Sequence, residues 1–250
     1  MKKIIKCKNV IFFLCSVFCV FNINYASNII GADKINTEKK GPGFEIEKEK
    51  KIISSNHNLE DPFLILVNSS NPIDVNFIPP LKEVRGGLMM HESVASIVNK
   101  MIKDAKKEDI NLVVLSAYRS AERQAQLFEG KVKANVEKGM DLLTATVEAA
   151  KINPLPGTSE HQTGLCMDIV DKSNLKLDYE NENTLGYKWL LEHCAEYGFI
   201  LRYPKDKTEI TGIIYEPWHF RYVGVDIAKT IMENKLTLEE YIDIVSKAKK

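Results

Sequence analysis

The sequence contains few cysteines, and its apolar runs are short. The stretch at residues 10–23 has 14 residues, whereas a membrane-spanning helix needs about 20. Five cysteines occur among 250 residues, and three of them, Cys7, Cys15 and Cys19, lie close to the N-terminus. Cys166 and Cys194 alone cannot form a disulfide framework, so we expect free and mostly buried thiols.

An excess of charge of one sign is also missing, because 34 basic and 34 acidic residues give a formal net charge of zero. Four of the lysines, Lys2, Lys3, Lys6 and Lys8, lie in the first 26 residues, which contain no acid. The remainder therefore carries a net charge of about −4. Proteins that bind the phosphate backbone usually show a basic stripe, so we expect no nucleic-acid partner.

The first 26 residues have the pattern of an export signal. Their lysines precede the apolar stretch, a flank that a buried core helix would not need. Asn24-Tyr25-Ala26 offers a small residue only at its last position, which makes a weak cleavage site. We therefore expect residues 1–26 to be a signal peptide or an N-terminal membrane anchor.

Residues 27–61 are rich in charge and poor in apolar periodicity. Such a composition buries too little surface to offset the entropy of ordering, so we predict a flexible tether. A short exposed helix over residues 44–53 is the alternative. Residues 62–250 are predicted to form one α+β domain, which is within the usual size range for a domain.

Apolar periodicity predicts helices and strands mixed along this domain. The expected helices cover residues 91–107, a long segment capped by Ser120, and residues 140–151, 185–197, 225–234 and 238–249. The expected strands cover residues 63–67, 111–118, 165–170, 199–202 and 210–215.

Two histidines and two carboxylates form the clearest chemical pattern. His161 and Asp168 lie on either side of Gly164, and Glu216 lies three residues before His219. Three of these side chains could hold a zinc ion with one position open for water, and the remaining carboxylate could take the proton of that water. Spacing does not decide which carboxylate is the ligand. The helical His-Glu-x-x-His motif is absent, and we expect His57, His91 and His193 to be surface or core residues.

Four segments resemble the VanY-type D-alanyl-D-alanine carboxypeptidases, which are zinc peptidases of bacterial cell walls. They are Ser116-Ala117-Tyr118-Arg119-Ser120 with Gln124, Ser159-x-His161-x-x-Gly164-x-x-x-Asp168, Tyr197-Gly198-Phe199-Ile200-Leu201-Arg202-Tyr203-Pro204, and Thr211-Gly212 through Glu216-Pro217-Trp218-His219-Phe220-Arg221-Tyr222-Val223-Gly224. The likeness spans about residues 63–234. Ala117 and Cys166 depart from the family pattern, which commonly has Gly and a small residue such as Ala there.

The resemblance implies a zinc D,D-peptidase (hedgehog-like) fold, with a small central antiparallel sheet flanked by helices. It also implies that His161, Asp168 and His219 ligate Zn2+ and that Glu216 is the catalytic base. Arg119 would bind the terminal carboxylate of a peptide or the oxyanion that forms during hydrolysis. Further candidates for substrate binding are Ser116, Tyr118, Ser120, Gln124, Ser159, Tyr203 and Trp218. For three of them a simpler role is open: Ser120 as a helix cap, Tyr118 in the core, and Trp218 packing beside the metal.

The predicted function is zinc-dependent removal of a C-terminal D-alanine from peptidoglycan stem peptides. We expect a monomer outside the cytoplasm, in the cell wall or anchored to the membrane and facing the wall. The sequence does not separate D,D- from L,D-specificity. The alternatives are a wall endopeptidase of related fold and a zinc-bearing binding module without catalysis. Glu216 argues against the latter, because a pure binder does not need a base.

Overall fold

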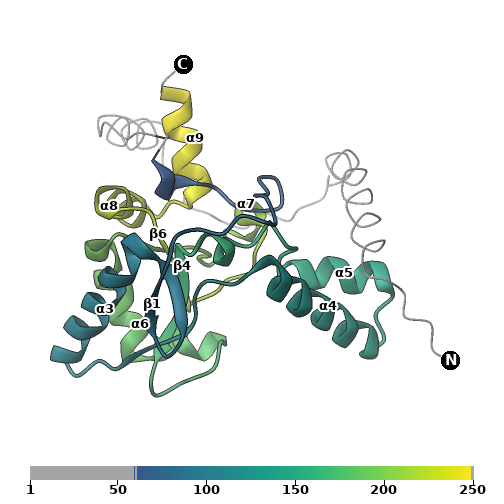
Figure 1. Ribbon diagram of the computed structural model, residues 1–250, viewed down its shortest axis with the longest axis horizontal. Helices are drawn as coiled ribbons and strands as arrows, with labels where there is room; N and C mark the ends of the chain where they lie inside the picture. The colour runs from purple at the N-terminus through teal and green to yellow at the C-terminus, as the bar shows by residue number, and fades with distance from the viewer. Residues whose placement is uncertain (1–58, 60, 249–250) are drawn as a thin grey trace, which may run out of the picture. The chain divides into compact units, whose positions relative to one another are not determined.

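The computed structural model describes residue 59 and residues 61–248 of the chain (Figure 1). The sequence prediction for residues 1–26 lies outside the described residues, as does nearly all of that for residues 27–61. Among the helices that the structure describes, none combines the length and the apolar character required to cross a membrane.

The centre of the fold is a four-stranded antiparallel sheet with the strand order β3-β4-β6-β5. Its strands are β3 (Leu112–Ser116), β4 (Cys166–Asp171), β6 (His219–Tyr222) and β5 (Phe199–Leu201). The strands β4 and β6 lie at the middle of the sheet, and nearly all of their residues are buried. The predicted α+β class and the small antiparallel sheet are therefore confirmed.

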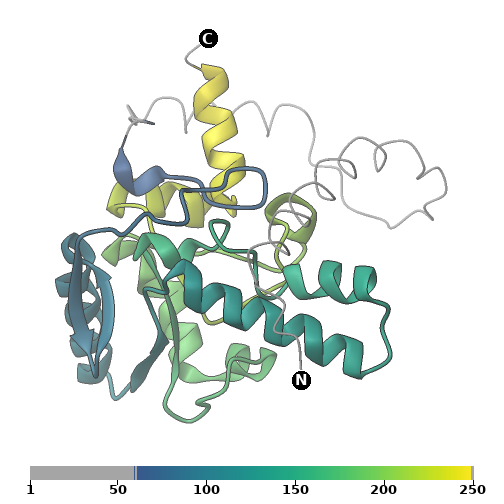
Figure 2. The ribbon, with the colours of Figure 1, turned by 45° about the vertical axis from the view of Figure 1, so that its right-hand side comes forward.

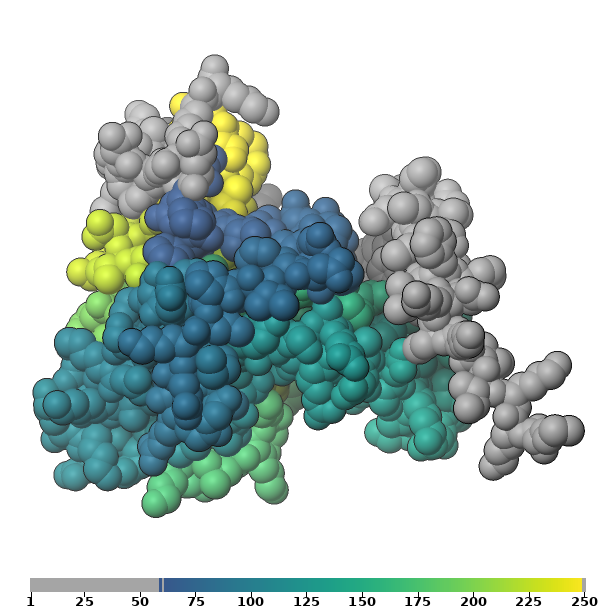
Figure 3. Space-filling model, in the orientation of Figure 1, coloured from purple at the N-terminus to yellow at the C-terminus, as the bar shows by residue number. Residues whose placement is uncertain are grey.

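A second, two-stranded sheet precedes this one in the chain. It pairs β1 (Leu81–Arg85) with β2 (Leu88–His91) around the turn at Gly86 and Gly87. The helix α3 (Glu92–Lys107) follows directly and packs against both strands and against β3. Together with residues 61–80, which precede it, the hairpin covers much of the face seen in Figure 3.

Helices flank the sheet. The helix α6 (Leu185–His193) packs against β4, and α8 (Val225–Asn234) packs against β5. The last described helix, α9 (Leu238–Ala248), contributes Leu238 and Tyr241 to a core cluster shared with α8. Two further helices, α4 (Ala121–Glu137) and α5 (Leu142–Ala150), pack on each other and extend away from the sheet (Figures 1 and 2).

Two predicted strands are wrong. Over residues 63–67 the structure has a short 3₁₀ helix, η2 (Pro62–Leu64), followed by irregular chain whose carbonyl groups bind an arginine side chain instead of a sheet neighbour. Over residues 210–215 it has the end of the helix α7 (Thr208–Thr211) and then Gly212 with a left-handed φ of 75°. The hairpin β1–β2 was not predicted, because most of its β1 side chains are exposed and the strand lacks an apolar pattern.

Candidate metal and catalytic site

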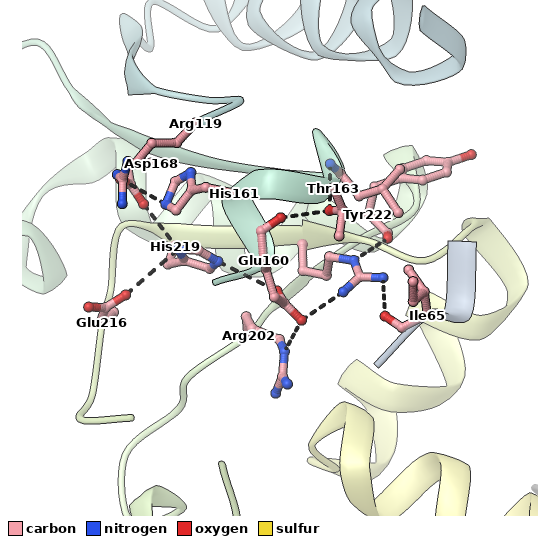
Figure 4. A network of polar contacts seen from close by, with 12 residues as sticks. Ile65, Arg119, Glu160, His161, Thr163, Asp168, Arg202, Glu216, His219 and Tyr222 are labelled. Carbon is pink, nitrogen blue, oxygen red and sulfur yellow. Dashed lines mark hydrogen bonds and ion pairs between the residues drawn. The ribbon is translucent and has the colours of Figure 1, made fainter. Parts of the chain in front are cut away.

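The predicted metal-binding residues come together at the middle of the sheet. Asp168 on β4 is paired directly with His219 on β6. His161 comes from the short 3₁₀ helix η3 (Glu160–Thr163), which ends at Gly164 with a φ of 68°. That left-handed turn leads the chain into β4 and brings His161 over Asp168 (Figure 4). All three side chains are buried.

The backbone fixes which ring nitrogen of His161 faces the site. Its Nδ1 lies 2.7 Å from the carbonyl oxygen of Ala117, which can only accept a hydrogen bond, so Nδ1 carries the proton. In the neutral ring the other nitrogen, Nε2, then has a lone pair, and it lies 3.4 Å from Oδ2 of Asp168. His161 is therefore prepared to bind a cation through Nε2.

His219 presents the opposite ring nitrogen. Its Nδ1 lies 3.1 Å from Oδ1 of Asp168 and 3.7 Å from Oε2 of Glu216. The rings of His161 and His219 are perpendicular, with centroids 5.0 Å apart. Two imidazole nitrogens thus point at the same carboxylate from different directions.

This donor set fits a zinc ion. Two ligand atoms bound tetrahedrally at about 2.0–2.1 Å from Zn2+ are about 3.3 Å apart. The two nitrogen-to-oxygen distances, 3.4 Å for His161 and 3.1 Å for His219, bracket that value. Two imidazoles with one carboxylate are also a ligand set of catalytic zinc sites, in which a position stays open.

Cys166 is a further donor at the same place, which the sequence did not predict. Its Sγ and one nitrogen each of His161 and His219 all lie within 4.8 Å of one another. Burial alone would raise the pKa of this thiol, but the two neighbouring histidines lower it to about 7. The expectation of free, buried thiols is confirmed for both Cys166 and Cys194.

Glu216 lies beside the donor set, at the end of the segment that leads into β6. Its side chain is buried, and burial raises the pKa of this carboxyl to about 7 although His219 acts to lower it. Pro217 follows and cannot join a ladder, and the amide of His219 donates to the carbonyl of Glu216 in a tight turn. This turn places Glu216 and His219 on the same side, which an ideal strand would not do.

Arg119 lies in the loop between β3 and α4 and is held by several hydrogen bonds. Its amide donates to the carbonyl of His161, its Nη1 to Oε1 of Gln124, and its Nη2 to Oγ of Ser116. Nη2 also lies 3.8 Å from Oδ2 of Asp168. A guanidinium has five N–H donors, so donors remain for a ligand.

These groups line one cleft of about 350 Å³. Among the residues predicted to bind substrate, Arg119, Ser159, Tyr203 and Trp218 face the cleft. The predicted metal-binding residues and Glu216 line it as well. Apolar side chains of three further segments complete its walls, and they are Ile152, Pro154, Leu177, Tyr179, Ile213 and Ile214.

The other predicted substrate-binding residues do not line this cleft. Ser116 and the buried Gln124 hold the guanidinium of Arg119, and Gln124 also donates to the carbonyl of Pro154. Ser120 accepts from the amide of Arg123 and so caps α4. Tyr118 is partly buried, and its amide donates to the carbonyl of Met89.

A buried ionic network beneath the histidines was also missed. Glu160 accepts hydrogen bonds from Arg202 and Arg221, and all three side chains are fully buried. One signal was available in the sequence, because each arginine follows apolar strand residues and would require a buried partner. Which acid that partner is could not be read from the sequence, since Glu160 lies 42 residues from Arg202 and 61 from Arg221.

Several known proteins are similar to this chain in sequence. The profile of the family described as VanY, D-alanyl-D-alanine carboxypeptidase, matches residues 87–225. A D-alanyl-D-alanine carboxypeptidase of Enterococcus faecalis is 38% identical over 180 residues, which are 72% of this chain and 65% of that protein. A bifunctional D-Ala-D-Ala dipeptidase and carboxypeptidase of Enterococcus gallinarum, VanXYC, is 35% identical over 73% of this chain and 95% of its own length. The chain thus spans less than two thirds of the Enterococcus faecalis relative.

Solved structures show the same fold. A D,D-pentapeptidase VanY variant from a VanB-type resistance cassette, in complex with Zn(II), has a TM-score of 0.66 and 37% identity, covering 73% of this chain and 99% of that one. VanYB in complex with D-alanine-D-alanine has a TM-score of 0.65 and 38% identity, covering 72% and 97%. The L,D-carboxypeptidase LdcB also has a TM-score of 0.65 and 38% identity, covering 74% and 89%.

Proposed function

Because the chain belongs to the VanY D-alanyl-D-alanine carboxypeptidase family, we propose that it is a zinc-dependent carboxypeptidase acting on peptidoglycan stem peptides. The observation that carries this proposal is the convergence of His161, Asp168 and His219 in one cleft with Glu216 and Arg119. Three of them form a donor set for zinc, one is a buried carboxyl beside it, and one is a cation that could bind a peptide end. The cleft thus contains each group that the reaction requires.

His161 would hold zinc through Nε2, His219 through Nδ1, and Asp168 through its carboxylate. When bound there, zinc would lower the pKa of a water molecule and polarise the scissile carbonyl group. We do not assign Cys166 to the ligand set, since the spacing of the other three already fits a tetrahedral ion. The thiol is the alternative third ligand if Asp168 is not one.

Glu216 would take a proton from the attacking water and then donate it to the departing amine of D-alanine. A carboxyl with a pKa near 7 suits both steps, because it accepts and releases a proton at neutral pH. The position of Glu216 next to Nδ1 of His219 supports this role. The aromatic and aliphatic walls of the cleft would reduce the access of bulk water to the reacting atoms.

Arg119 would bind the free carboxylate at the C-terminus of the peptide, or the oxyanion that forms on the scissile carbonyl. A complex of VanYB with D-alanine-D-alanine supports a peptide of this kind as substrate. The similarity to LdcB equally supports an L,D-substrate, in which the last D-alanine is joined to a residue through a carbon of L-configuration. We therefore propose that the protein acts on D,D- or L,D-peptides. We also propose that it is exported and acts on the cell wall as a monomer.

Mass spectrometry of defined peptides tests this proposal. Zinc-loaded protein should remove a single C-terminal D-alanine from a synthetic penta- or tetrapeptide, and chelation or Glu216→Ala should lower the rate about 10²–10⁴-fold. Glu209→Ala is the control, because Glu209 is exposed on α7 and does not line the cleft. Full release of D-alanine after chelation or by the Glu216 variant would contradict the proposal. Equal cleavage of peptides whose terminal carboxylate is amidated would favour an endopeptidase.

A further inference from the structure

Glu160 has a carboxylate whose two oxygens face different partners. Oε1 accepts hydrogen bonds from Nε of Arg202 and from Nη1 of Arg221, each at 2.7 Å (Figure 4). The other oxygen, Oε2, faces away from both guanidinium groups and toward the ring of His219. The side chain of Glu160 is completely buried. Its one open oxygen is therefore directed at a metal-binding residue.

His219 leaves the matching atom open. Its Nε2 is buried and has no hydrogen-bond partner among the described residues, and the same is true of Oε2 of Glu160. These two atoms lie 3.6 Å apart. A buried polar atom without a partner costs free energy, so two such atoms facing each other point to one hydrogen bond between them.

We propose that Glu160 is a positioning residue that accepts the Nε2–H of His219 and thereby presents the Nδ1 lone pair to the metal. This inference rests on the proposed function, because it requires zinc at the site. A histidine that ligates a metal usually donates its other ring N–H to a carboxylate or carbonyl, which fixes the tautomer and the orientation of the ring. The inference assigns that carboxylate to Glu160.

The same cleft contains an independent example of this arrangement. His161 donates Nδ1–H to the carbonyl of Ala117 and presents Nε2 to the site. In His219 the roles of the two nitrogens are exchanged, so the outer partner must lie on the Nε2 side of the ring. Glu160 Oε2 is the acceptor that the structure places there.

The arginines explain why Glu160 can hold this position. Arg202 binds Glu239 of α9 through two hydrogen bonds, of 2.8 and 2.6 Å, in addition to its bond to Glu160. Two guanidinium groups and two carboxylates thus balance their charges inside the domain. The carboxylate of Glu160 is held from two sides and cannot rotate Oε1 toward His219 without losing both bonds.

Zinc affinity of two Glu→Gln variants tests the proposal. In Glu160→Gln the amide oxygen can still accept from both arginines, but the amide nitrogen would face Nε2 of His219 and favour the tautomer whose Nδ1 is protonated. We expect the dissociation constant for zinc, measured by competition with a chromophoric chelator, to rise about 10–100-fold. Glu239→Gln makes the same charge change on Arg202 without touching His219 and should bind zinc as the wild type does. Equal affinities of the two variants would overturn the proposal.

A second measurement needs no variant, in case Glu160→Gln does not fold. Long-range ¹H–¹⁵N correlation spectra of the zinc-loaded wild type should show His219 protonated at Nε2 and metal-bound at Nδ1. Metal bound through Nε2 would overturn the inference. Failure of the wild type to bind zinc at all would instead contradict the proposed function. A wild type that binds zinc and releases D-alanine, with Glu160→Gln equal to it in affinity, would contradict this inference alone.

Discussion

Asp168 and His219 are directly opposed residues on the neighbouring strands β4 and β6, and their Oδ1 and Nδ1 atoms are 3.1 Å apart. Side chains alternate between the faces of a strand, so Cys166, two residues before Asp168, lies on the same face. The register of a single strand pair therefore gathers a carboxylate, an imidazole and a thiol. This arrangement raises the question of which of the three bind the metal.

Substitution of Cys166 and of Asp168 should separate the two ligand sets. We expect Cys166→Ala to keep a zinc affinity close to that of the wild type, because His161, Asp168 and His219 suffice. Asp168→Ala should weaken zinc binding by more than the roughly 10–100-fold that results from removing a hydrogen-bond partner of a ligand. The cobalt-substituted wild type should lack an intense sulfur-to-cobalt charge-transfer band. A strong band that disappears in Cys166→Ala would show that the thiol is a ligand.

Arg119 should matter for substrates with a free terminal carboxylate. Lysine keeps the charge but cannot form a bidentate pair, so Arg119→Lys should lower kcat/KM for a free-acid peptide by about 10²-fold. The wild type should strongly prefer the free acid to the C-terminal amide, and the variant should lose most of that preference. Arg123→Lys is the control, because Arg123 lies close by in the first turn of α4, is exposed and binds Gln126. Unchanged discrimination in Arg119→Lys would exclude Arg119 as the carboxylate-binding group.

The stability of the metal-free protein should depend on pH through Glu216. Its pKa is raised by burial from the ordinary 4.5 to about 7, so the folded state binds this proton more tightly than the unfolded state. The favourable contribution is complete below pH 4.5 and is lost as the pH rises through 7, amounting to at most about 3 kcal/mol.

Urea unfolding in the presence of a chelator measures this effect. Relative to Glu216→Gln, which has no titrating group at this position, the wild type should lose free energy of unfolding as the pH rises from about 4.5 to about 7. Added zinc should shrink the difference, because a cation next to the carboxyl favours its charged form. A difference that stays constant over this pH range would contradict the assignment.

Gly164 should be required for the conformation of the turn that positions His161. Its φ is 68°, and a Cβ at this residue would lie 2.9 Å from the amide nitrogen of His91. Gly164→Ala should therefore lower the free energy of unfolding by at least about 1–2 kcal/mol and weaken zinc binding. Gly130→Ala on the exposed face of α4 meets no atom within 4 Å and should instead stabilise the helix by about 0.5–1 kcal/mol. Thermal unfolding of both variants checks this contrast.

Local patterns predicted much of this structure. The spacing of apolar residues predicts helices such as α3 and α8. The short motif around Gly164 keeps His161 close to Asp168 along the chain. The wrong strand at residues 63–67 has an apolar run like that of a true strand. Its backbone partner, however, is a distant guanidinium that no local pattern reveals.

Contacts between distant residues account for what the sequence could not predict at the site. Glu160 meets Arg202, which follows β5, and Arg221 on β6 only through the packing of these strands near η3. The position of Cys166 near the histidines depends on strand register. Ser116 and Gln124 belong to a motif that implied substrate contact, but the structure shows their side chains bound to Arg119. A motif identifies which residues gather, and only the packed fold shows which of them face the cleft.

The contacts of Arg221 limit how far the domain can be truncated from its N-terminal side. Its Nη2 donates to the backbone carbonyls of Phe63 and Ile65, at 2.9 and 2.8 Å, while its Nη1 binds Glu160. A truncated protein beginning after Ile65 would leave that fully buried guanidinium without two of its acceptors. The shortest fragment that keeps an intact site must therefore begin before Phe63, well ahead of residue 87, where the match to the family profile starts.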